Sequence, residues 1–176
     1  MTNAIESSGQ QSQYQSVVEF NKTFGVPVQD SPQMDVFEKN PTLVQFRMNL
    51  IREEMKELEE AVSNSDLTET IDALTDLIYV IHGMGSCLGL NLDKAFDIVH
   101  KSNMSKLCNS EQEALDTVEF YKDNTSLGYD SPAYRPTSDG KYYVVYNANT
   151  GKVLKSINYT PANFDSVLSP LQKNTA

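Results

Sequence analysis

Two groups of carboxylates interrupt the apolar pattern of two successive predicted helices. The first group is Glu53-Glu54-Met55-Lys56-Glu57, inside a helical periodicity that covers residues 42–63. At ~100° per residue, one apolar stripe follows this helix and a second apolar row runs beside it. Glu54 and Glu57 continue the second row where the next hydrophobic residues are expected, and Glu53 borders it. The solvated face lies elsewhere, on Asn49, Arg52, Lys56, Glu59, Glu60 and Ser63.

The next predicted helix, residues 67–88, repeats this arrangement. Its main apolar stripe consists of Leu67, Ile71, Leu74, Ile78, Ile81 and Leu88. Glu69, Asp72 and Asp76 fall on the opposite side, in line with Ala73, Val80 and Cys87. No charged residue occurs between Asp76 and Asp93, so we expect this helix to lie deep in the fold. The short connection at residues 64–66 predicts an antiparallel pair with both carboxylate groups near the same end.

Carboxylates that face inward from both helices would repel one another, and each would lose its hydration. A hard divalent cation, which prefers oxygen ligands, would offset both costs. An i, i+3 spacing, as in ExxE and ExxD, directs two side chains of one helix to the same point. The alternative is an ordinary solvated acidic face. Asp66-Leu67-Thr68-Glu69 also matches a capping box, which gives Glu69 a structural role at the helix start. The set as a whole favours a metal site.

The EExxE spacing, followed eleven residues later by ExxD, resembles the signature of the all-α nucleoside triphosphate pyrophosphohydrolases. This is the superfamily of MazG and phosphoribosyl-ATP pyrophosphohydrolase. The stretch from Asp72 to Val80, and residues 99–107 with Asn103 and Lys106, are similar to single-domain members from bacteria and phages. The resemblance covers about residues 14–125.

The resemblance implies a mostly α fold with a four-helix core, assembled as a homodimer or a larger homo-oligomer such as a tetramer. It implies hydrolysis of a nucleoside triphosphate, here a deoxynucleotide, to the monophosphate and pyrophosphate, with Mg²⁺ or alternatively Mn²⁺. In the superfamily the carboxylates bind metal and activate water, and the Asn and Lys contact the nucleotide. Carried over, the metal ligands are Glu54, Glu57, Glu69 and Asp72; the catalytic carboxylates are Glu53 and Glu54; the substrate contacts are Asn103 and Lys106; Asp76 supports the ligands.

Three segments organise the chain around this core. Residues 1–12 are polar and are expected to form a flexible tail, residues 13–125 the helical catalytic domain, and residues 126–176 an extension. Within the domain we expect a helix at about 13–24, with Val17, Phe20 and Phe24 on its core side, and an extended segment at 26–41. A further helix at about 91–103 should point Leu92, Phe96 and Val99 inward. A capping box at Ser110 begins another, to about residue 123.

The extension carries strand signals. Residues 141–146 and 153–157 are rich in β-branched and aromatic residues, and they flank Asn149-Thr150-Gly151-Lys152, which is typical of a hairpin turn. An isolated hairpin is marginally stable, so we expect it to pack on the helices or on another subunit. Its tyrosines could stack on a base, although aromatic strand residues more often serve in packing.

The composition limits the partners. A net charge of −10 argues against nucleic acid and anionic membranes as ligands. Two cysteines are too few for a disulfide framework, and we expect both to be reduced. The sequence shows neither a signal peptide nor a membrane span, which predicts a cytoplasmic protein.

Other functions remain open at this point. One is the phosphoribosyl-ATP pyrophosphohydrolase of histidine biosynthesis, whose domains are typically shorter and lack the extension. Others are a non-catalytic helical oligomer that binds nucleotide or metal, and a metal-buffering acidic protein. The chain has no GxxxxGK[ST] loop, so no Walker-type site for cleavage of the terminal phosphate is expected.

Overall fold

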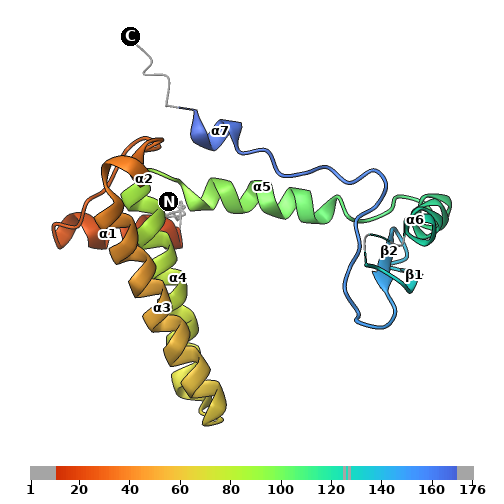
Figure 1. Cartoon of the computed structure of the whole chain (residues 1–176), viewed down its shortest axis with the longest axis horizontal. Helices are drawn as coiled ribbons and strands as arrows, with labels where there is room; N and C mark the ends of the chain where they lie inside the picture. Colours follow the sequence, from red (N-terminus) through yellow and green to blue (C-terminus); the bar gives the residue numbers. More distant parts are fainter. Residues whose placement is uncertain (1–10, 125, 127, 170–176) are drawn as a thin grey trace, which may run out of the picture. The chain divides into compact units, whose positions relative to one another are not determined.

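The computed structural model describes residues 11–124, 126 and 128–169, so most of the predicted N-terminal tail lies outside the described residues. The described chain is mostly helical, with one small antiparallel sheet towards its C-terminal end (Figure 1). It divides into two compact units. The first unit contains the described residues up to Ala95 and from Phe164 onward, and the second contains Phe96–Asn163. The mostly α fold predicted from the sequence is therefore confirmed.

Two long antiparallel helices dominate the first unit, α3 (Pro41–Ser63) and α4 (Leu67–Leu88) (Figure 1). Both have strong start signals. Pro41 occupies the first turn of α3 and Asn40 caps it, while the Asp66 carboxylate accepts hydrogen bonds from the Thr68 and Glu69 amides of α4. The reciprocal half of the predicted capping box, a bond from Glu69 back to the main chain, is not among these contacts. The two helices match their predicted bounds to within a residue.

Gly89 ends α4 in the left-handed conformation, with φ of 72°. A side chain is excluded here for a second reason, because a Cβ atom would lie 1.9 Å from the carbonyl oxygen of Ser31. The segment that passes so closely is fixed by two main-chain hydrogen bonds to the end of α4, from Gln29 to Ser86 and from Gln33 to Leu88. The predicted extended segment is thus present, but it contains a short unpredicted helix, α2 (Val36–Lys39).

The two faces of α4 have different surroundings. Small residues, among them the buried Ala73 and Gly83, form the side that packs on α3. The predicted main stripe points away: Leu67 is 82% exposed and Ile71 is 64% exposed, and Leu74, Ile78 and Ile81 are also exposed. The prediction that the whole helix lies deep in the fold is therefore wrong for the single chain. The buried residues of α4 are concentrated near its C-terminal end, within residues 83–88. Helix α1 also packs on α4.

Helix α1 (Gln13–Thr23) packs on α4 through fewer side chains than its sequence suggests. Val17 is buried, as predicted, and Asn21 donates a hydrogen bond of 2.6 Å to the Ser86 hydroxyl. Phe20 and Phe24 are exposed, so their predicted place in the core is wrong. Instead their rings stack on each other, and Phe20 meets Tyr79 edge to face. The side chain of Asn21 is therefore buried against α4, where the periodicity predicted the aromatic side chains of α1.

Helix α5 (Leu92–Met104) begins in the first unit and continues in the second. Leu92 packs against Gly85 of α4, as an inward residue should. Phe96 is 70% exposed and Val99 is also exposed, so the inward position predicted for these two is wrong in the single chain. Late in the sequence, helix α7 (Asp165–Leu168) belongs to the first unit again. Its Ser166 and Val167 border the same small cavity as Tyr14 and Val18 of α1.

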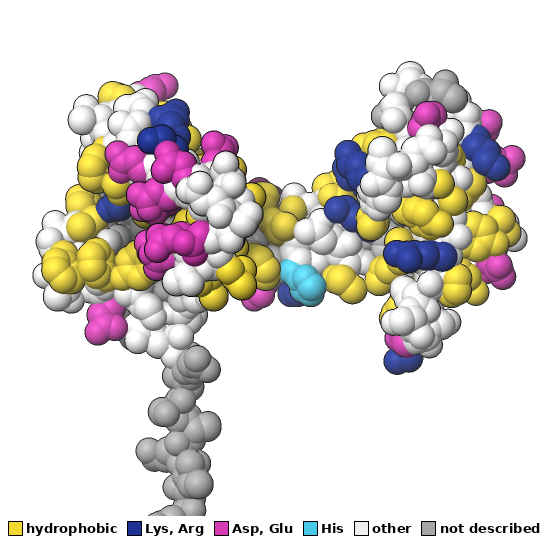
Figure 2. All heavy atoms as spheres, turned by 90° about the horizontal axis from the view of Figure 1, so that it is seen from below, with side chains coloured by type: hydrophobic (Ala, Val, Ile, Leu, Met, Phe, Trp, Pro, Cys, Tyr) yellow, Lys and Arg dark blue, Asp and Glu magenta, His cyan; other side chains and the backbone are white. Residues whose placement is uncertain are grey.

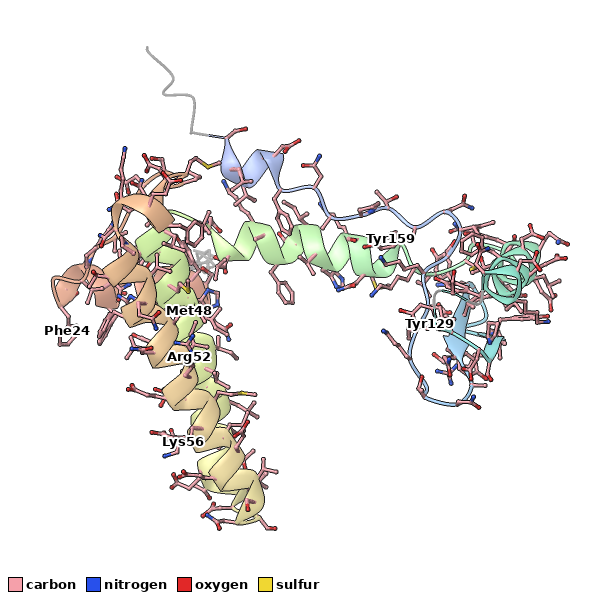
Figure 3. The ribbon with its side chains drawn as sticks, in the orientation of Figure 1. Phe24, Met48, Arg52, Lys56, Tyr129 and Tyr159 are labelled. Carbon is pink, nitrogen blue, oxygen red and sulfur yellow. The ribbon has the colours of Figure 1, made fainter. Side chains whose placement is uncertain are left out.

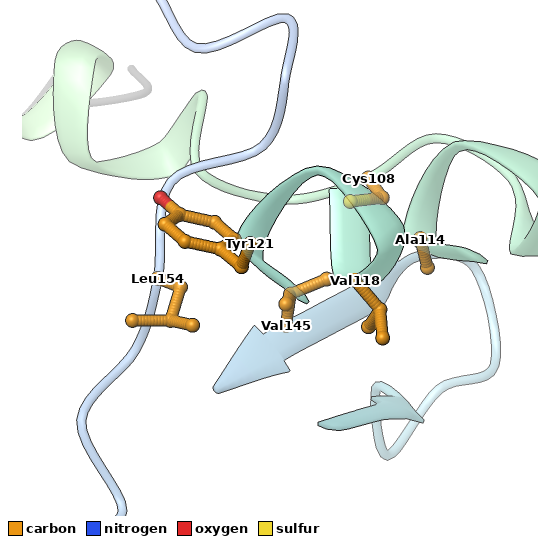
Figure 4. Close-up of a cluster of buried hydrophobic side chains, with 6 residues drawn as sticks. All are labelled: Cys108, Ala114, Val118, Tyr121, Val145 and Leu154. Carbon is orange, nitrogen blue, oxygen red and sulfur yellow. The ribbon is translucent and has the colours of Figure 1, made fainter. Parts of the chain in front are cut away.

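The second unit has its own hydrophobic cluster, built on α6 (Glu111–Asp123). As predicted, the Ser110 hydroxyl caps this helix, by accepting a hydrogen bond from the Glu113 amide. The buried side chains of the cluster come from α6, the sheet and the flanking segments: Cys108, Ala114, Val118, Tyr121, Val145 and Leu154 (Figure 4). Cys87 and Cys108 are both buried and free, which agrees with the expected reduced state.

The first predicted strand, residues 141–146, is present as β2 (Tyr143–Asn147), but its partner in the sheet differs from the predicted one. Strand β1 (Pro132–Pro136) runs antiparallel to β2 (Tyr143–Asn147), with Tyr134 opposite Val145, and both strands pack on α6. The predicted second strand, residues 153–157, forms a single bridge between Val153 and Tyr146. The prolines at both ends of β1 look like loop signals in the sequence. They are tolerated because this is an edge strand, where lost amide donors face away from the ladder.

Candidate functional site

The predicted carboxylates lie on the two long helices of the first unit. Glu53, Glu54 and Glu57 are on α3, and Glu69, Asp72 and Asp76 are on α4. Figure 2 views this unit from the side of the α3–α4 turn, where acidic side chains gather beside apolar ones. The predicted solvated face is confirmed as well. Its members are all exposed, and Figure 3 shows Arg52 and Lys56 on the outer side of α3.

Glu54 is the centre of this group. It is partly buried, whereas its neighbours on α3 and α4 are exposed. Burial raises the pKa of its carboxyl above the ordinary value, and the charges of Glu57, Asp76, Glu53 and Asp72 raise this pKa further. The structure therefore brings carboxylates from both helices close enough to act on one another. In the described part of the chain, none of these five forms an ion pair with a Lys, Arg or His side chain.

These residues suit a hard divalent cation, because carboxylate oxygens are the ligands that Mg²⁺ and Mn²⁺ prefer. Burial is the main cause of the raised pKa of Glu54, and four neighbouring carboxylates add to it, so a bound cation would lower this pKa. As placed, no three or more Asp, Glu, His or Cys side chains of the described residues converge closely enough to hold an ion. The donor chemistry fits a metal, and the ligand assignment remains the prediction made from the sequence.

Glu69 differs from the other predicted ligands. It is exposed in the first turn of α4, and its charge is not among those that raise the pKa of Glu54. Its amide is bonded to the capping carboxylate of Asp66 at 3.1 Å. A carboxylate near a helix N-terminus is also favourable for the helix dipole. Both the structural role and the ligand role of Glu69 are compatible with this position.

The predicted nucleotide contacts, Asn103 and Lys106, lie together in the second unit. The Lys106 ammonium donates a hydrogen bond of 2.8 Å to the side-chain oxygen of Asn103. Asn103 is exposed and Lys106 is partly exposed, and Lys106 forms no ion pair with a described residue. An amide and an ammonium held side by side present donors to an anionic group. The carboxylates and this pair thus belong to different units.

Sequence reasoning missed Arg47. This α3 residue is only 6% exposed, its Nε has no hydrogen-bond partner among the described residues, and its guanidinium approaches the Phe46 ring at 5.8 Å. It lies two helical turns before Glu54, hence on the same side of α3. A buried guanidinium that forms no ion pair with a described carboxylate lowers the stability of the fold. The sequence signal that could have indicated this position is the spacing of seven residues between Arg47 and Glu54, which places both on one side of a helix.

Comparison with known proteins concerns the same part of the chain. Residues 17–103 match the phosphoribosyl-ATP pyrophosphohydrolase family, and this range contains both helices and all six carboxylates. The chain belongs to this family. It is also 32% identical to an uncharacterized protein of Acanthamoeba polyphaga mimivirus, in an alignment that covers 88% of this chain and 95% of the viral one.

The family consists of pyrophosphohydrolases, which cleave phosphoric anhydride bonds, and the superfamily predicted from the EExxE and ExxD spacing is confirmed. The match ends at Asn103, before Lys106, α6 and the sheet. In the described parts of the chain, no single helix has both the length and the apolar composition for crossing a membrane, although α4 and α5 taken together across their bend pass that test.

Proposed function

We propose that the protein is a metal-dependent nucleoside triphosphate pyrophosphohydrolase that acts on a deoxynucleotide and releases the monophosphate and pyrophosphate. One observation carries this proposal: the partly buried Glu54 is affected by four other carboxylates from two helices, and none of the five forms an ion pair with a described Lys, Arg or His. Such an arrangement is unfavourable for stability alone. It becomes favourable when divalent cations and the phosphates of a substrate are present.

We assign these residues the roles that the family resemblance implies. Glu54, Glu57, Glu69 and Asp72 would hold Mg²⁺, or Mn²⁺, which supplies a bound water of lowered pKa and screens the phosphates. Glu53 borders the group and would accept the proton of the attacking water, unless Glu54 does so. Asp76, whose charge also acts on Glu54, would orient the ligands from one turn beyond Asp72.

The test has two parts. The eight common ribo- and deoxyribonucleoside triphosphates are incubated with the protein, with Mg²⁺ or with EDTA, and the products are separated. We expect monophosphate and pyrophosphate only with metal, with the highest kcat/KM for a deoxynucleotide. Turnover in ¹⁸O-labelled water should place the label on the monophosphate, as attack at the α-phosphorus requires. Label in orthophosphate, with diphosphate accumulating, would contradict the proposal.

The matched family is named for a second substrate, phosphoribosyl-ATP, and this supports an alternative with the same chemistry. Both substrates would use the same carboxylates, so the distinction lies in how the rest of the nucleotide is recognised. Phosphoribosyl-ATP therefore belongs in the panel. A kcat/KM for it that exceeds every deoxynucleotide would replace our substrate assignment. No turnover of any of these compounds, together with tight metal or nucleotide binding, would favour a non-catalytic oligomer.

We also propose that the exposed stripe of α4 is covered by a second copy of the chain. Leu67, Ile71, Leu74, Ile78 and Ile81 form a continuous apolar face along the helix that carries three of the carboxylates. A contiguous apolar surface of this kind is unusual on a monomer. Light scattering after gel filtration should give a dimer or tetramer, and Leu74→Asp should give a monomer. Arg52→Asp, on the solvated face, is the control and should leave the oligomer intact.

A further inference from the structure

The second unit contains a pocket unlike the acidic surface of the rest of the chain. Its volume is about 810 Å³, and it lies between α6, the segment before β1 and the segment after β2. Cavities that bind small molecules usually measure roughly 300–1,000 Å³. Three lysines border it, namely Lys106, Lys152 and Lys155, and none of the described residues that line it is acidic. In a chain of net charge −10, this concentration of positive charge is selective for an anion.

The lysines of the pocket are not neutralised. None of the three forms an ion pair with a described residue. Lys152 donates a hydrogen bond of 3.2 Å to the Tyr129 hydroxyl and lies 5.0 Å from the centre of that ring. Lys155 lies 4.5 Å from the ring centre of Tyr159. Ammonium–ring contacts at exposed sites are weak, so these lysines can turn to a phosphate at little cost.

Aromatic and aliphatic side chains supply the walls. Tyr129 and Tyr159, both labelled in Figure 3, approach from the segments before β1 and after β2. Phe120 of α6 is 45% exposed, and Val153 and Ile157 are exposed to a similar degree. The rings of Tyr129 and Tyr159, which lie beside the ammonium groups, are partly exposed. Accessible rings and ammonium groups in one pocket form the combination that binds a planar base together with its phosphate. Without a ligand, this apolar surface remains in contact with water.

The segment that carries Lys155 is fixed from behind. The Tyr121 hydroxyl both donates to the carbonyl oxygen and accepts from the amide of Lys155, at 3.1 and 3.2 Å. On either side of Lys155, Leu154 is 2% exposed and Ser156 is 4% exposed, and the Ser156 hydroxyl donates to Glu113 of α6. Alternate residues are thus anchored inward, which leaves Lys155 directed outward. The pocket wall is therefore built in advance of binding.

We propose that this pocket is a second nucleotide-binding site, in which the base stacks on the aromatic rings of its walls and a phosphate binds Lys152 and Lys155. The site lies beyond the part of the chain that matches the family. It needs no metal, because the ammonium groups themselves supply the positive charge. The carboxylates of α3 and α4 repel phosphates when no cation is present, so the two sites can be separated by removing metal.

Calorimetric titration of the full chain with AMP, in EDTA, tests the proposal. We expect AMP to bind without metal, and adenosine or pyrophosphate alone to bind more weakly. Lys155→Glu should weaken AMP binding at least about tenfold, because a charge-assisted hydrogen bond is replaced by repulsion. Phe120→Ala should weaken AMP more than pyrophosphate. Lys141→Glu is the matched control, since it makes the same charge change at an exposed lysine of this unit outside the pocket.

Several outcomes would overturn the proposal. The first is no AMP binding to the wild-type chain in EDTA. The second is equal weakening by Lys141→Glu and Lys155→Glu, which would indicate general electrostatics. Pyrophosphate binding as tightly as AMP would remove the base from the assignment. Weakening by Glu54→Gln to the same extent as by Lys155→Glu would place AMP at the carboxylates. Thermal unfolding of each variant shows whether it is folded, and none of these results depends on catalysis.

Discussion

Replacing Glu54 by Gln should stabilise the metal-free protein and at the same time impair its response to metal. Glu54 has its pKa raised by burial and by four neighbouring carboxylates, Glu57, Asp76, Glu53 and Asp72. A neutral amide of nearly the same shape removes the repulsion without leaving a cavity. The same change removes a predicted ligand, so the loss of function and the gain of stability have one cause.

The size of the gain follows from the number of neighbours. A like-charge pair on a helix surface costs roughly 0.2–0.5 kcal/mol. Glu57 forms such a pair with Glu54. The other three carboxylates, taken at a similar size and discounted because all are exposed, bring the total to about 1 kcal/mol. For a chain of this length, that difference raises the melting temperature by about 2–4 °C. Metal at a hundred times its Kd stabilises the native state by about 2.7 kcal/mol. A variant that binds metal tenfold more weakly would receive about 1.4 kcal/mol less, enough to cancel its advantage.

The assay is thermal unfolding at two pH values, with EDTA and with Mg²⁺. Because the folded-state pKa of Glu54 is raised above its ordinary 4.5, the native state retains this proton more strongly than the unfolded chain. The stability from this proton is present below pH ~4.5 and is lost as the pH rises through the folded-state pKa. The advantage of Glu54→Gln should therefore be full at pH 8 and absent near pH 4. With Mg²⁺, turnover should fall at least about 100-fold.

Glu59→Gln is the better of two possible controls, because Glu60 forms an ion pair of 3.2 Å with Lys56 whereas Glu59 is simply exposed. We expect this control to change stability by less than about 0.5 kcal/mol and to leave turnover near wild type. If Glu54→Gln lowers the melting temperature in EDTA at pH 8, Glu54 makes a stabilising contact and our account of the group is incorrect. Near-normal turnover would exclude Glu54 from the catalytic site.

Gly89→Ala should destabilise the first unit by more than about 2 kcal/mol in urea unfolding, because the new Cβ would collide with the Ser31 carbonyl. Gly151→Ala is the control. Gly151 has a similar φ but open space around it, so this change should cost only about 1 kcal/mol. Arg47→Met should raise the unfolding free energy in EDTA by roughly 1 kcal/mol or more, because it removes a buried charge that forms no ion pair with a described carboxylate. It should also lower kcat/KM. A loss of stability would indicate that the guanidinium has a stabilising partner in the native protein. Tyr121→Phe removes two hydrogen bonds to the main chain and should cost about 1–2 kcal/mol, with faster amide exchange at residues 154–157.

The long helices were predictable because their signals are local and agree with one another. Periodicity, Pro41 at the start of α3, the cap at Asp66 and Gly89 at the end of α4 all give the same bounds. The relation between carboxylates on the two helices was also predictable, since a three-residue turn determines which ends meet. Sequence alone gave no such constraint on what covers the outer stripe of α4, because periodicity identifies an apolar face but not its partner.

The errors came from contacts between distant parts of the chain. Arg47 is buried because α1 and α4 converge on it, with Gly83 leaving the space, and nothing in its neighbours along the sequence indicates this. Strand β1 was missed because Pro132 and Pro136 are typical of loops, while the residues after β2 have stronger strand character. Pairing was decided instead by packing on α6, where Val145 and Leu154 share one cluster.

The return of the chain to the first unit at Phe164 affects the order in which the molecule can form. Residues 96–163 are synthesised before α7, so the second unit has its complete sequence on the ribosome while the first unit still lacks a segment. The cavity beside Tyr14 and Val18 receives Ser166 and Val167 only afterwards. Closing a flexible loop becomes more costly only slowly as it lengthens, so the delay carries a small entropic penalty. The second unit therefore needs no residue beyond 163 to be complete, whereas the first needs α7 from the end of the chain.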